Sequence, residues 1–312
     1  MDLVEAVLAG DRRAVARAIS MVEDGAEGLA ELSSGLFAHT GRASTIGLTG
    51  SPGVGKSTLA GELVRLARRR QLSVAVLAID PTSPFTGGAL LGDRLRMQEH
   101  ATDPGVFIRS MATRGHLGGM ALAAPEAVRI LDASGKDLVM VETVGVGQAE
   151  VEVAAATDTT LVVVSPGWGD AVQVAKAGIL EIADVFVVNK SDREGADATA
   201  RDLEQMIRMG APADWTPPVV RASAQRSEGI DELWEAMARH RGHLGETGQL
   251  ERKRRAWLLR EVEGLAGERL RGGVRDALAR DPELADEVAA RTTDPYRAAD
   301  ILIERLSRAG EP

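Results

Sequence analysis

The sequence predicts an α/β fold with a doubly wound, mostly parallel sheet and helical extensions at both ends. Short β-branched runs alternate with amphipathic segments between residues 45 and 224, and several of these runs are apolar throughout. Continuous apolar runs are typical of strands buried on both faces of a parallel sheet. At the two ends of the chain, apolar residues recur at helical spacing and such runs are missing. We therefore expect an N-terminal helical arm (1–43), an α/β domain (44–245) and a C-terminal helical extension (246–312).

Short apolar runs are the candidate strands, and a helical pattern at 58–67 follows the first of them. The runs cover residues 45–49, 72–79, 106–110, 138–141, 160–164, 185–188 and 219–221. Pro81 follows the second run and is expected to end that strand in a turn. In open parallel sheets, ligands bind beyond the C-terminal ends of the strands. Polar residues that follow these runs are therefore the candidates for chemistry.

The N-terminal arm is expected to form short helices. Apolar residues make one face near residues 3–8, and Gly10 then interrupts the pattern. Asp11 is placed to cap a second helix, and a third is expected at 29–37. This segment carries no recognisable chemistry, so we expect it to pack on the core or on a partner.

The C-terminal extension is also expected to be helical. A long charged helix is predicted at 251–271, after a helix at 230–237 that closes the α/β domain. Asp281-Pro282 and Asp294-Pro295 each place a capping acid before a proline, which predicts two further helix starts. The long helix is either an ordinary packed helix or a dimerisation arm, and helices beyond a complete domain favour the arm.

The composition restricts the class of protein. The formal charge of −9 argues against nucleic-acid binding, since no block of Lys and Arg offsets it. The basic run 252–255 lies in a helical pattern and is expected to be a solvated face. The absence of cysteine excludes disulfides and thiolate metal sites and fits a reducing compartment. No apolar run reaches membrane-spanning length and no signal-peptide pattern is present, so we expect a cytoplasmic protein without a membrane partner.

A phosphate-binding loop is the strongest motif. The stretch 50–57 fits G-x-x-x-x-G-K-[ST] and lies between a predicted strand and a predicted helix, as that loop requires. Its glycines allow successive N–H groups to point at one anion, near a helix N-terminus. Lys56 would bind the β- and γ-phosphates, and the Ser57 hydroxyl would bind Mg²⁺. The expected nucleotide contacts here are Gly50, Ser51, Pro52, Gly53, Val54, Gly55, Lys56, Ser57 and Thr58.

Three acidic residues are candidate Mg²⁺ ligands. Asp80 ends the second strand, Asp93 follows a glycine-rich stretch, and Glu142 ends the fourth strand and precedes a glycine loop. A carboxylate and a glycine loop at that place are typical of a site that contacts Mg²⁺ and the γ-phosphate. Because Mg²⁺ shared with phosphate needs one or two carboxylates, we expect its ligands among Ser57, Asp80, Asp93 and Glu142. The candidate catalytic residues are Lys56, Asp93 and Glu142.

The stretch from Asn189 to Asp192 fits N-K-x-D, the guanine-binding motif of GTP-binding proteins. A carboxylate at the fourth position can accept from both N1–H and the exocyclic N2–H of guanine, a pairing that adenine does not offer. Asn189 would brace the loop and contact the purine N7, and the Lys190 stem would lie along the ring. Ser223 and Ala224 follow the last strand, where a backbone N–H would contact the guanine carbonyl oxygen. These motifs together predict a GTPase that binds GTP and GDP.

The motifs resemble those of the MeaB/ArgK family of P-loop GTPases. The resemblance rests on 51–57, 80–84, 142–150 and 189–192, above all on a glutamate at Glu142 where most GTPases have aspartate. It spans nearly the whole chain, including both helical ends. It implies a homodimeric G-protein chaperone of adenosylcobalamin-dependent acyl-CoA mutases, chiefly methylmalonyl-CoA mutase. Such a protein gates delivery of the cobalamin cofactor and protects the mutase from inactivation.

The resemblance also implies a loop after the strand at 160–164 that signals to the mutase. In this chain Asp170, Gln173 and Lys176 match the family positions proposed to couple that loop to nucleotide. Gln173 and Lys176 are three residues apart, so a helix would present both on one face. The segment contains a tryptophan and differs from the commoner Gly-Asp-Glu-Leu-Gln pattern, which leaves an isobutyryl-CoA or related mutase open as the partner.

Other functions stay open on the sequence alone. A metal chaperone of the urease or hydrogenase type would carry Cys or His clusters, whereas this chain has no cysteine and five scattered histidines. A kinase or ATPase that supports amino-acid transport is disfavoured by Asp192, which suits guanine. A GTP-switched binding protein would show nucleotide-dependent affinity without stimulation by its partner. No catalytic arginine or glutamine is identifiable, so a partner could supply part of the charge stabilisation in the transition state.

Overall fold

The computed structural model describes residues 2–81, 100, 102–113, 119–143, 156–167, 179–211 and 213–309. The chain forms two compact units, Met1–Trp257 and Leu258–Pro312. The first unit contains the sheet and the candidate nucleotide-binding loops. The second unit is helical.

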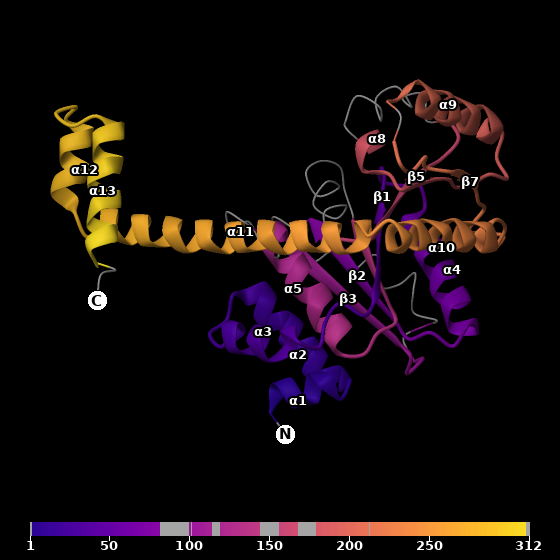
Figure 1. The fold of residues 1–312 in the computed structure, drawn as a ribbon, viewed down its shortest axis with the longest axis horizontal. Coiled ribbons are helices and arrows are strands. Elements are labelled where there is room, and N and C mark those ends of the chain that lie inside the picture. The colour runs from indigo at the N-terminus through magenta and orange to yellow at the C-terminus, as the bar shows by residue number, and fades with distance from the viewer. Residues whose placement is uncertain are drawn as a thin grey trace. The chain divides into compact units, whose positions relative to one another are not determined.

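A seven-stranded sheet lies at the centre of the first unit (Figure 1), and all of its strand pairs are parallel. The strands are β1 (Ser44–Thr49), β2 (Val74–Pro81), β3 (Val106–Thr113), β4 (Leu138–Thr143), β5 (Thr159–Val164), β6 (Val185–Val188) and β7 (Val219–Arg221). Their order is β3-β2-β4-β1-β5-β6-β7. The order reverses at β1, and in open parallel sheets the ligand crevice lies beyond the strand ends at that point.

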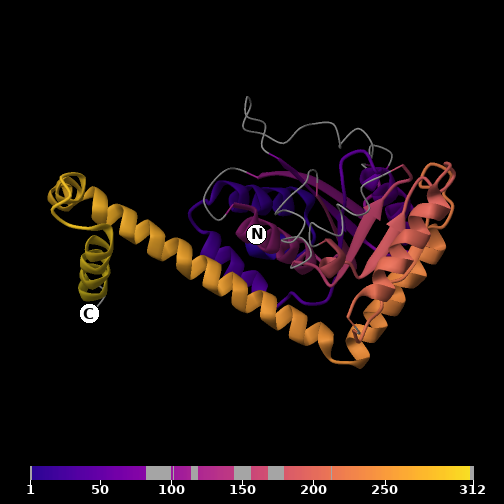
Figure 2. The same ribbon diagram turned by 90° about the horizontal axis from the view of Figure 1, so that it is seen from above.

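Helices cover both faces of the sheet, as Figures 1 and 2 show. These helices include α4 (Lys56–Arg69), α5 (Gly119–Ala133), α8 (Ile179–Ile182), α9 (Ala196–Met209) and α10 (Ile230–Glu246). Alternate strand residues point to opposite faces. Val74 and Val76 of β2 therefore pack with α4 and α10, whereas Ala75 and Leu77 pack with α5. Burial on both faces explains why several of the strands are apolar throughout.

Three N-terminal helices join the core on the α5 face. They are α1 (Leu3–Leu8), α2 (Arg12–Asp24) and α3 (Leu29–Phe37). Val7, Ile19 and Leu36 pack there with residues of β2, β4 and α5. Asp11 caps α2 as expected, since its carboxylate accepts from the Ala14 N–H at 2.8 Å. This segment is thus part of the first unit's core.

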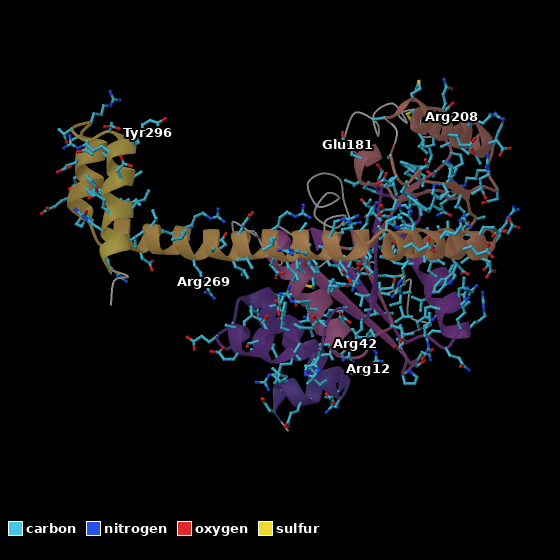
Figure 3. The ribbon with its side chains drawn as sticks, in the orientation of Figure 1. Arg12, Arg42, Glu181, Arg208, Arg269 and Tyr296 are labelled. Atoms are coloured by element: carbon cyan, nitrogen blue, oxygen red, sulfur yellow. The ribbon has the colours of Figure 1, made fainter. Side chains whose placement is uncertain are left out.

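The second unit has a small core of its own. It comprises the end of α11 (Gln249–Ala279), then α12 (Pro282–Ala289) and α13 (Pro295–Ala309). Leu284, Ala298 and Leu302 are buried together there. The expected capping acids are confirmed: Asp281 accepts from a backbone N–H of α12, and Asp294 from two of α13. Many side chains remain exposed in this unit, Tyr296 among them (Figure 3).

The predicted fold class is confirmed, and the differences concern element ends. β2 begins at Val74 rather than at Leu72, because Ser73 is bonded instead to Asp137 through its N–H and hydroxyl, both at 2.7 Å. β2 ends at Pro81, one residue beyond Asp80, where the strand was expected to end. The long helix spans Gln249–Ala279, more than the predicted 251–271. Among the helices in the described ranges, none combines the length and apolarity needed to cross a membrane.

Candidate nucleotide-binding site

The phosphate loop connects β1 to α4 and needs its glycines. Gly50, Gly53 and Gly55 have φ angles of 138°, 81° and 95°, a region that side-chain-bearing residues rarely adopt. A Cβ on Gly50 would also lie 2.1 Å from the carbonyl oxygen of Val163 in β5. A Cβ on Gly55 would lie 2.5 Å from Nδ2 of Asn189. The loop can therefore take this path only with glycine at Gly50 and Gly55.

Lys56 places a positive charge inside the curve of this loop. Its side chain is buried, and its ammonium group donates to the carbonyl oxygens of Gly50 at 2.5 Å and Ser51 at 3.1 Å. The N-terminus of α4 begins at the same residue and adds partial positive charge. The loop is thus arranged to bind an anion such as a phosphate group.

Ser57 and Glu142 meet beside the phosphate loop. The Ser57 hydroxyl donates to Oε1 of Glu142 at 2.6 Å, and both side chains are buried. The sheet register explains the contact, because Glu142 of β4 pairs with Leu48, close to the end of β1. Hydroxyl and carboxylate oxygens are ligands that Mg²⁺ accepts together with phosphate oxygens. The pair therefore fits a divalent cation bound with a nucleotide.

The other acidic candidates are only partly placed. Asp80 lies two residues beyond Ala78, which pairs with Glu142, so its backbone reaches the same C-terminal edge of the sheet. Its side chain is outside the described part of the structure, and Asp93 lies wholly outside the described residues. Asp170, Gln173 and Lys176 also lie outside the described residues. Their assigned roles stay predictions.

Replacing Glu142 by glutamine is expected to raise the Mg²⁺ concentration needed for half-maximal GTP hydrolysis by about tenfold or more. The amide keeps an oxygen that accepts from Ser57 but loses the negative charge that favours a cation. Initial rates across a magnesium titration measure this change. The exposed Glu235 on α10 supplies the matched control, Glu235→Gln. An unchanged magnesium requirement in Glu142→Gln would remove Glu142 from the metal site.

Asn189 joins three loops of the candidate site. Its buried amide donates from Nδ2 to the carbonyl oxygen of Val54 at 2.8 Å. Its Oδ1 accepts from the Ala224 N–H at 3.1 Å. Lys190 adds a contact from Nζ to the carbonyl oxygen of Gly53 at 2.6 Å, and its φ of 57° turns the backbone sharply. The loop 189–192 and the phosphate loop are therefore held directly against each other.

Asp192 is oriented by Ser223. The Ser223 hydroxyl donates to Oδ1 of Asp192 at 2.7 Å, and Nε of Arg226 lies 3.8 Å from Oδ2. The Ser223 hydrogen bond, supported by the charge of Arg226, lowers the pKa of Asp192 below its ordinary value. The carboxylate is therefore ionised at neutral pH and can accept two hydrogen bonds from guanine. Sequence analysis assigned Ser223 to guanine through its backbone and missed this side-chain contact.

The backbone donors expected to face guanine bond within the protein in this structure. The Ser223 N–H donates to the carbonyl oxygen of Glu228 at 3.0 Å, and the Ala224 N–H donates to Asn189. The predicted contact of this loop with the guanine carbonyl stays a prediction.

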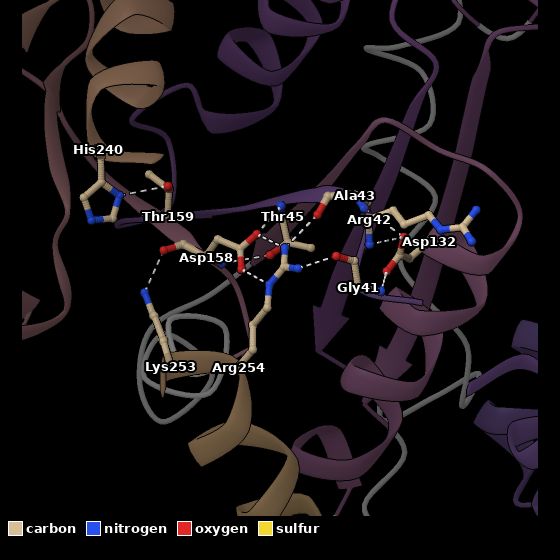
Figure 4. Close-up of polar contacts among 10 residues, drawn as sticks. All are labelled: Gly41, Arg42, Ala43, Thr45, Asp132, Asp158, Thr159, His240, Lys253 and Arg254. Atoms are coloured by element: carbon tan, nitrogen blue, oxygen red, sulfur yellow. Dashed lines mark hydrogen bonds and ion pairs between the residues drawn. The ribbon is translucent and has the colours of Figure 1, made fainter. Parts of the chain in front are cut away.

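A second polar cluster lies at the opposite, N-terminal edge of the sheet (Figure 4). Arg254 of α11 forms a bidentate ion pair with Asp158, with bonds of 2.8 and 2.7 Å. It also donates to the carbonyl oxygens of Gly41 at 2.5 Å and Ala43 at 2.8 Å. Asp158 in turn accepts from the Thr45 N–H at 3.0 Å. These contacts tie the start of α11 to the bases of β1 and β5.

Asp184 contacts two further residues of this cluster. Its carboxylate lies 3.3 Å from Nζ of Lys253 and 3.2 Å from Nε2 of His240. Burial alone would raise the pKa of Asp184, but the hydrogen bond from His240 and the charge of Lys253 outweigh burial and lower it. The basic run 252–255 was expected to be a solvated face, and two of its members instead make these ion pairs. No local sequence pattern predicts a contact between residues so far apart in the sequence.

Replacing Arg254 by methionine is expected to lower the free energy of unfolding of the first unit by about 2–3 kcal/mol. The variant leaves the Asp158 side chain, which is 4% exposed, without its guanidinium partner. Denaturant unfolding followed by circular dichroism measures the change. Its neighbour Arg255 is exposed, so Arg255→Met should change the same quantity by less than about 0.5 kcal/mol. Equal stabilities of the two variants would contradict this role for Arg254.

Comparisons with known proteins find close relatives of this chain. A model of the family described as "Methylmalonyl Co-A mutase-associated GTPase MeaB" matches residues 15–279. A putative GTPase of Pyrococcus abyssi is 47% identical over 315 residues, covering 99% of this chain and 97% of the relative. The GTPase ArgK of Escherichia coli is 38% identical over 267 residues, which cover 81% of each chain. A solved structure described as a LAO/AO transport system kinase has a TM-score of 0.72 and 26% identity, and the match covers 98% of this chain and 96% of that one.

Proposed function

We propose that this chain, which belongs to the MeaB family of P-loop GTPases, acts as a G-protein chaperone of an adenosylcobalamin-dependent acyl-CoA mutase, most directly methylmalonyl-CoA mutase. The chain is a GTPase by its family and by relatives of 38–47% identity that are named GTPases. The proposed partner rests on the family description, which names an association with methylmalonyl-CoA mutase. In this proposal, GTP binding and hydrolysis gate cobalamin delivery and protect the mutase from inactivation.

The phosphate loop would bind the triphosphate, with Lys56 as the cation closest to its anionic oxygens. Mg²⁺ would be held by Ser57 and Glu142, with Asp80 and Asp93 as further candidates. When bound, Mg²⁺ supplies charge neutralisation on the β- and γ-phosphate oxygens. The buried contact between Ser57 and Glu142 holds both oxygens beside the loop.

The guanine-binding loop would select the base. Asp192 is ionised and held by Ser223, so its carboxylate would accept from guanine. Asn189 ties this loop to the phosphate loop, which fixes the spacing between the base and phosphate contacts. A rigid spacing of this kind lowers the entropic cost of binding the whole nucleotide.

GTP hydrolysis would be slow until the mutase contributes. Phosphoryl transfer depends mainly on positioning and charge stabilisation, which a partner can supply. Asp170, Gln173 and Lys176 are proposed to couple the nucleotide to the mutase, on the strength of their match to family positions. Replacing Lys176 by alanine should then reduce stimulation by the mutase while leaving GTP affinity unchanged.

The test is GTP hydrolysis by the purified chain, alone and with a purified cobalamin-dependent methylmalonyl-CoA mutase, with ATP as the control nucleotide. The proposal expects strong preference for GTP and acceleration by the mutase. Preference for GTP without binding to the mutase or acceleration would remove the chaperone role and leave the GTPase. Binding that depends on GTP without acceleration would indicate a GTP-switched binding protein instead. Repeating the assay with isobutyryl-CoA mutase separates the two possible partners.

One observation favours a second candidate function. A structure of similar fold, 26% identical to this chain, is described as a transport system kinase. Such an enzyme would turn over ATP and transfer its phosphate to an acceptor. Asp192 opposes this function, because adenine lacks the paired donors from which its carboxylate would accept. Faster turnover of ATP than of GTP would favour the kinase.

A homodimer formed through the C-terminal unit is part of the proposal. On α11 of that unit, Leu259, Val262 and Leu270 are 53%, 61% and 65% exposed. Large apolar side chains at such exposure are typical of a surface that another protein covers. Sedimentation equilibrium should report a dimer, and Val262→Asp with Leu270→Asp should yield a monomer that keeps its affinity for GTP. A wild-type monomer at micromolar concentration would refute the dimer.

A further inference from the structure

A cavity of about 620 Å³ lies at the N-terminal edge of the sheet, away from the phosphate loop. Its floor includes Ser44, Leu138 and Thr159, which are the first residues of β1, β4 and β5. The nucleotide-binding loops follow the opposite, C-terminal ends of these parallel strands. The cavity is therefore a separate feature of the first unit.

Each of three chain segments around the cavity contributes one cation. Arg42 precedes β1, Lys136 lies in the turn between α5 and β4, and Arg241 lies on α10. In the described part of the chain, no hydrogen bond or ion pair holds any of these three side-chain cations. Lys136 is half-buried whereas Arg42 and Arg241 are exposed, so these three like charges favour an anion at the mouth of the cavity.

The two carboxylates that line the cavity are already engaged. Asp132 accepts from the backbone N–H groups of Gly41 and Ala43, the latter at 2.9 Å. Asp137 accepts from the N–H and hydroxyl of Ser73, both at 2.7 Å. The Ser73 hydrogen bonds lower the pKa of Asp137 below its ordinary value. These acids hold the walls of the cavity together through neutral groups and form no close ion pair with the three cations.

The surroundings of Lys136 disfavour its positive charge. Partial burial lowers the pKa of Lys136, and the nearby Arg12 and Arg68 lower it further. Asp137 opposes this shift but does not cancel it. A bound anion would favour the charged ammonium group, so ligand binding and protonation of Lys136 support each other.

Apolar side chains form much of the remaining cavity lining, beside His39. Leu8, Leu72, Trp234 and Met237 line it, and Trp234 is packed against the guanidinium of Arg70 at 5.0 Å. The wall before β1 is fixed on both sides. Asp132 accepts from the N–H groups of this segment, and the guanidinium of Arg254 donates to the carbonyl oxygens of the same segment (Figure 4). Small-molecule sites of this size are commonly preformed and apolar, with a few convergent polar groups.

We propose that this cavity binds a small organic anion, with a carboxylate, phosphate or sulfonate group among Arg42, Lys136 and Arg241 and an apolar body against Trp234 and Met237. The site goes beyond the proposed function and does not depend on the mutase partner. Its location at the strand bases means that a ligand there would contact neither the phosphate loop nor Asp192.

The experiment uses the full chain and the dye 8-anilinonaphthalene-1-sulfonate, an aryl sulfonate that matches this chemistry. Binding is followed by energy transfer from tryptophan to the dye. Lys136→Gln with Arg241→Gln is expected to weaken dye affinity by roughly tenfold, since two favourable charges are removed. Ala238→Trp, which fills the cavity from α10, should abolish the same binding. Trp234→Phe should lower the energy transfer, because Trp234 lines the cavity.

The control is Arg239→Gln, an exposed arginine of α10 that does not line the cavity. It should leave dye affinity at the wild-type value. Equal affinities of the control and the double variant, or unchanged energy transfer in Trp234→Phe, would overturn the proposal and place the dye elsewhere, for example on the exposed apolar side chains of the second unit. GTP affinity should be the same in all of these variants, so this outcome is independent of the nucleotide site.

Discussion

Replacing Asp192 by asparagine is expected to lower GTP affinity by about 10³–10⁴-fold. In the native site, Ser223 holds an ionised carboxylate whose two oxygens can accept from N1–H and N2–H of guanine. An asparagine offers one oxygen and turns an amide donor toward the base, which leaves guanine donors unpaired. Titration with GTP, xanthosine triphosphate and ATP measures the change. The triphosphate of xanthine should gain affinity, because its carbonyl at position 2 can accept from the new amide.

Ser223→Ala provides a graded companion to this variant. Without the Ser223 hydrogen bond, the pKa of Asp192 should rise toward its ordinary value, and the carboxylate should be held less firmly. We expect a loss of GTP affinity of about tenfold, which corresponds to one charge-assisted hydrogen bond. Because a lowered pKa preserves the carboxylate as pH falls, GTP binding by Ser223→Ala should weaken at a higher pH than that of the wild type. Asp197→Asn, at an exposed salt bridge with Arg221, is the control. Wild-type affinity in Asp192→Asn would contradict the assigned role.

The fold was predictable from the sequence because its strands are buried on both faces. Several strands are short and apolar without alternation, as β6 is, and glycine or polar residues mark most of the strand ends. The phosphate loop was predictable because its backbone geometry admits only glycine at Gly50 and Gly55. Local pattern and local geometry agree at these places, so the sequence alone identifies them.

Tertiary contacts account for what the sequence did not predict. Gly272 and Gly273 suggest a helix end near residue 271, yet α11 continues to Ala279. A Cβ on Gly273 would lie 3.5 Å from a methyl group of Leu306, which is an ordinary contact distance, so this turn of α11 packs on α13. The helix continues there despite the low helix propensity of glycine.

The polar clusters could not be predicted from the sequence for another reason. Arg254 and Asp158 are 96 residues apart, and Ser223 and Asp192 are 31 apart. Charge and hydroxyl groups at such separations carry no periodic signal, and only the sheet topology brings them together. A run of basic residues at the start of a helix therefore resembled an ordinary solvated face.

Replacing Lys56 by alanine is expected to lower GTP affinity by about 10²–10³-fold, because the triphosphate loses its closest buried cation. The binding of guanosine, which has no phosphate, should stay near the wild-type value, since Asp192 and Asn189 are unchanged. Lys190→Ala is the control for the loss of a lysine that bonds to the same loop, at Gly53. It should lower GTP affinity by less than Lys56→Ala does. Equal losses of GTP and guanosine in Lys56→Ala would mean that the whole loop had collapsed.

The double variant Lys56→Ala with Asp192→Asn tests how the two halves of the site communicate. The base and phosphate contacts share no side chain, so their free-energy losses should add to within about 0.5 kcal/mol if the halves are independent. Asn189 is the one described side chain that bonds to both the phosphate loop and the loop after β7. A coupling energy that disappears when Asn189 is also replaced by alanine would show that Asn189 transmits base recognition to the phosphate site.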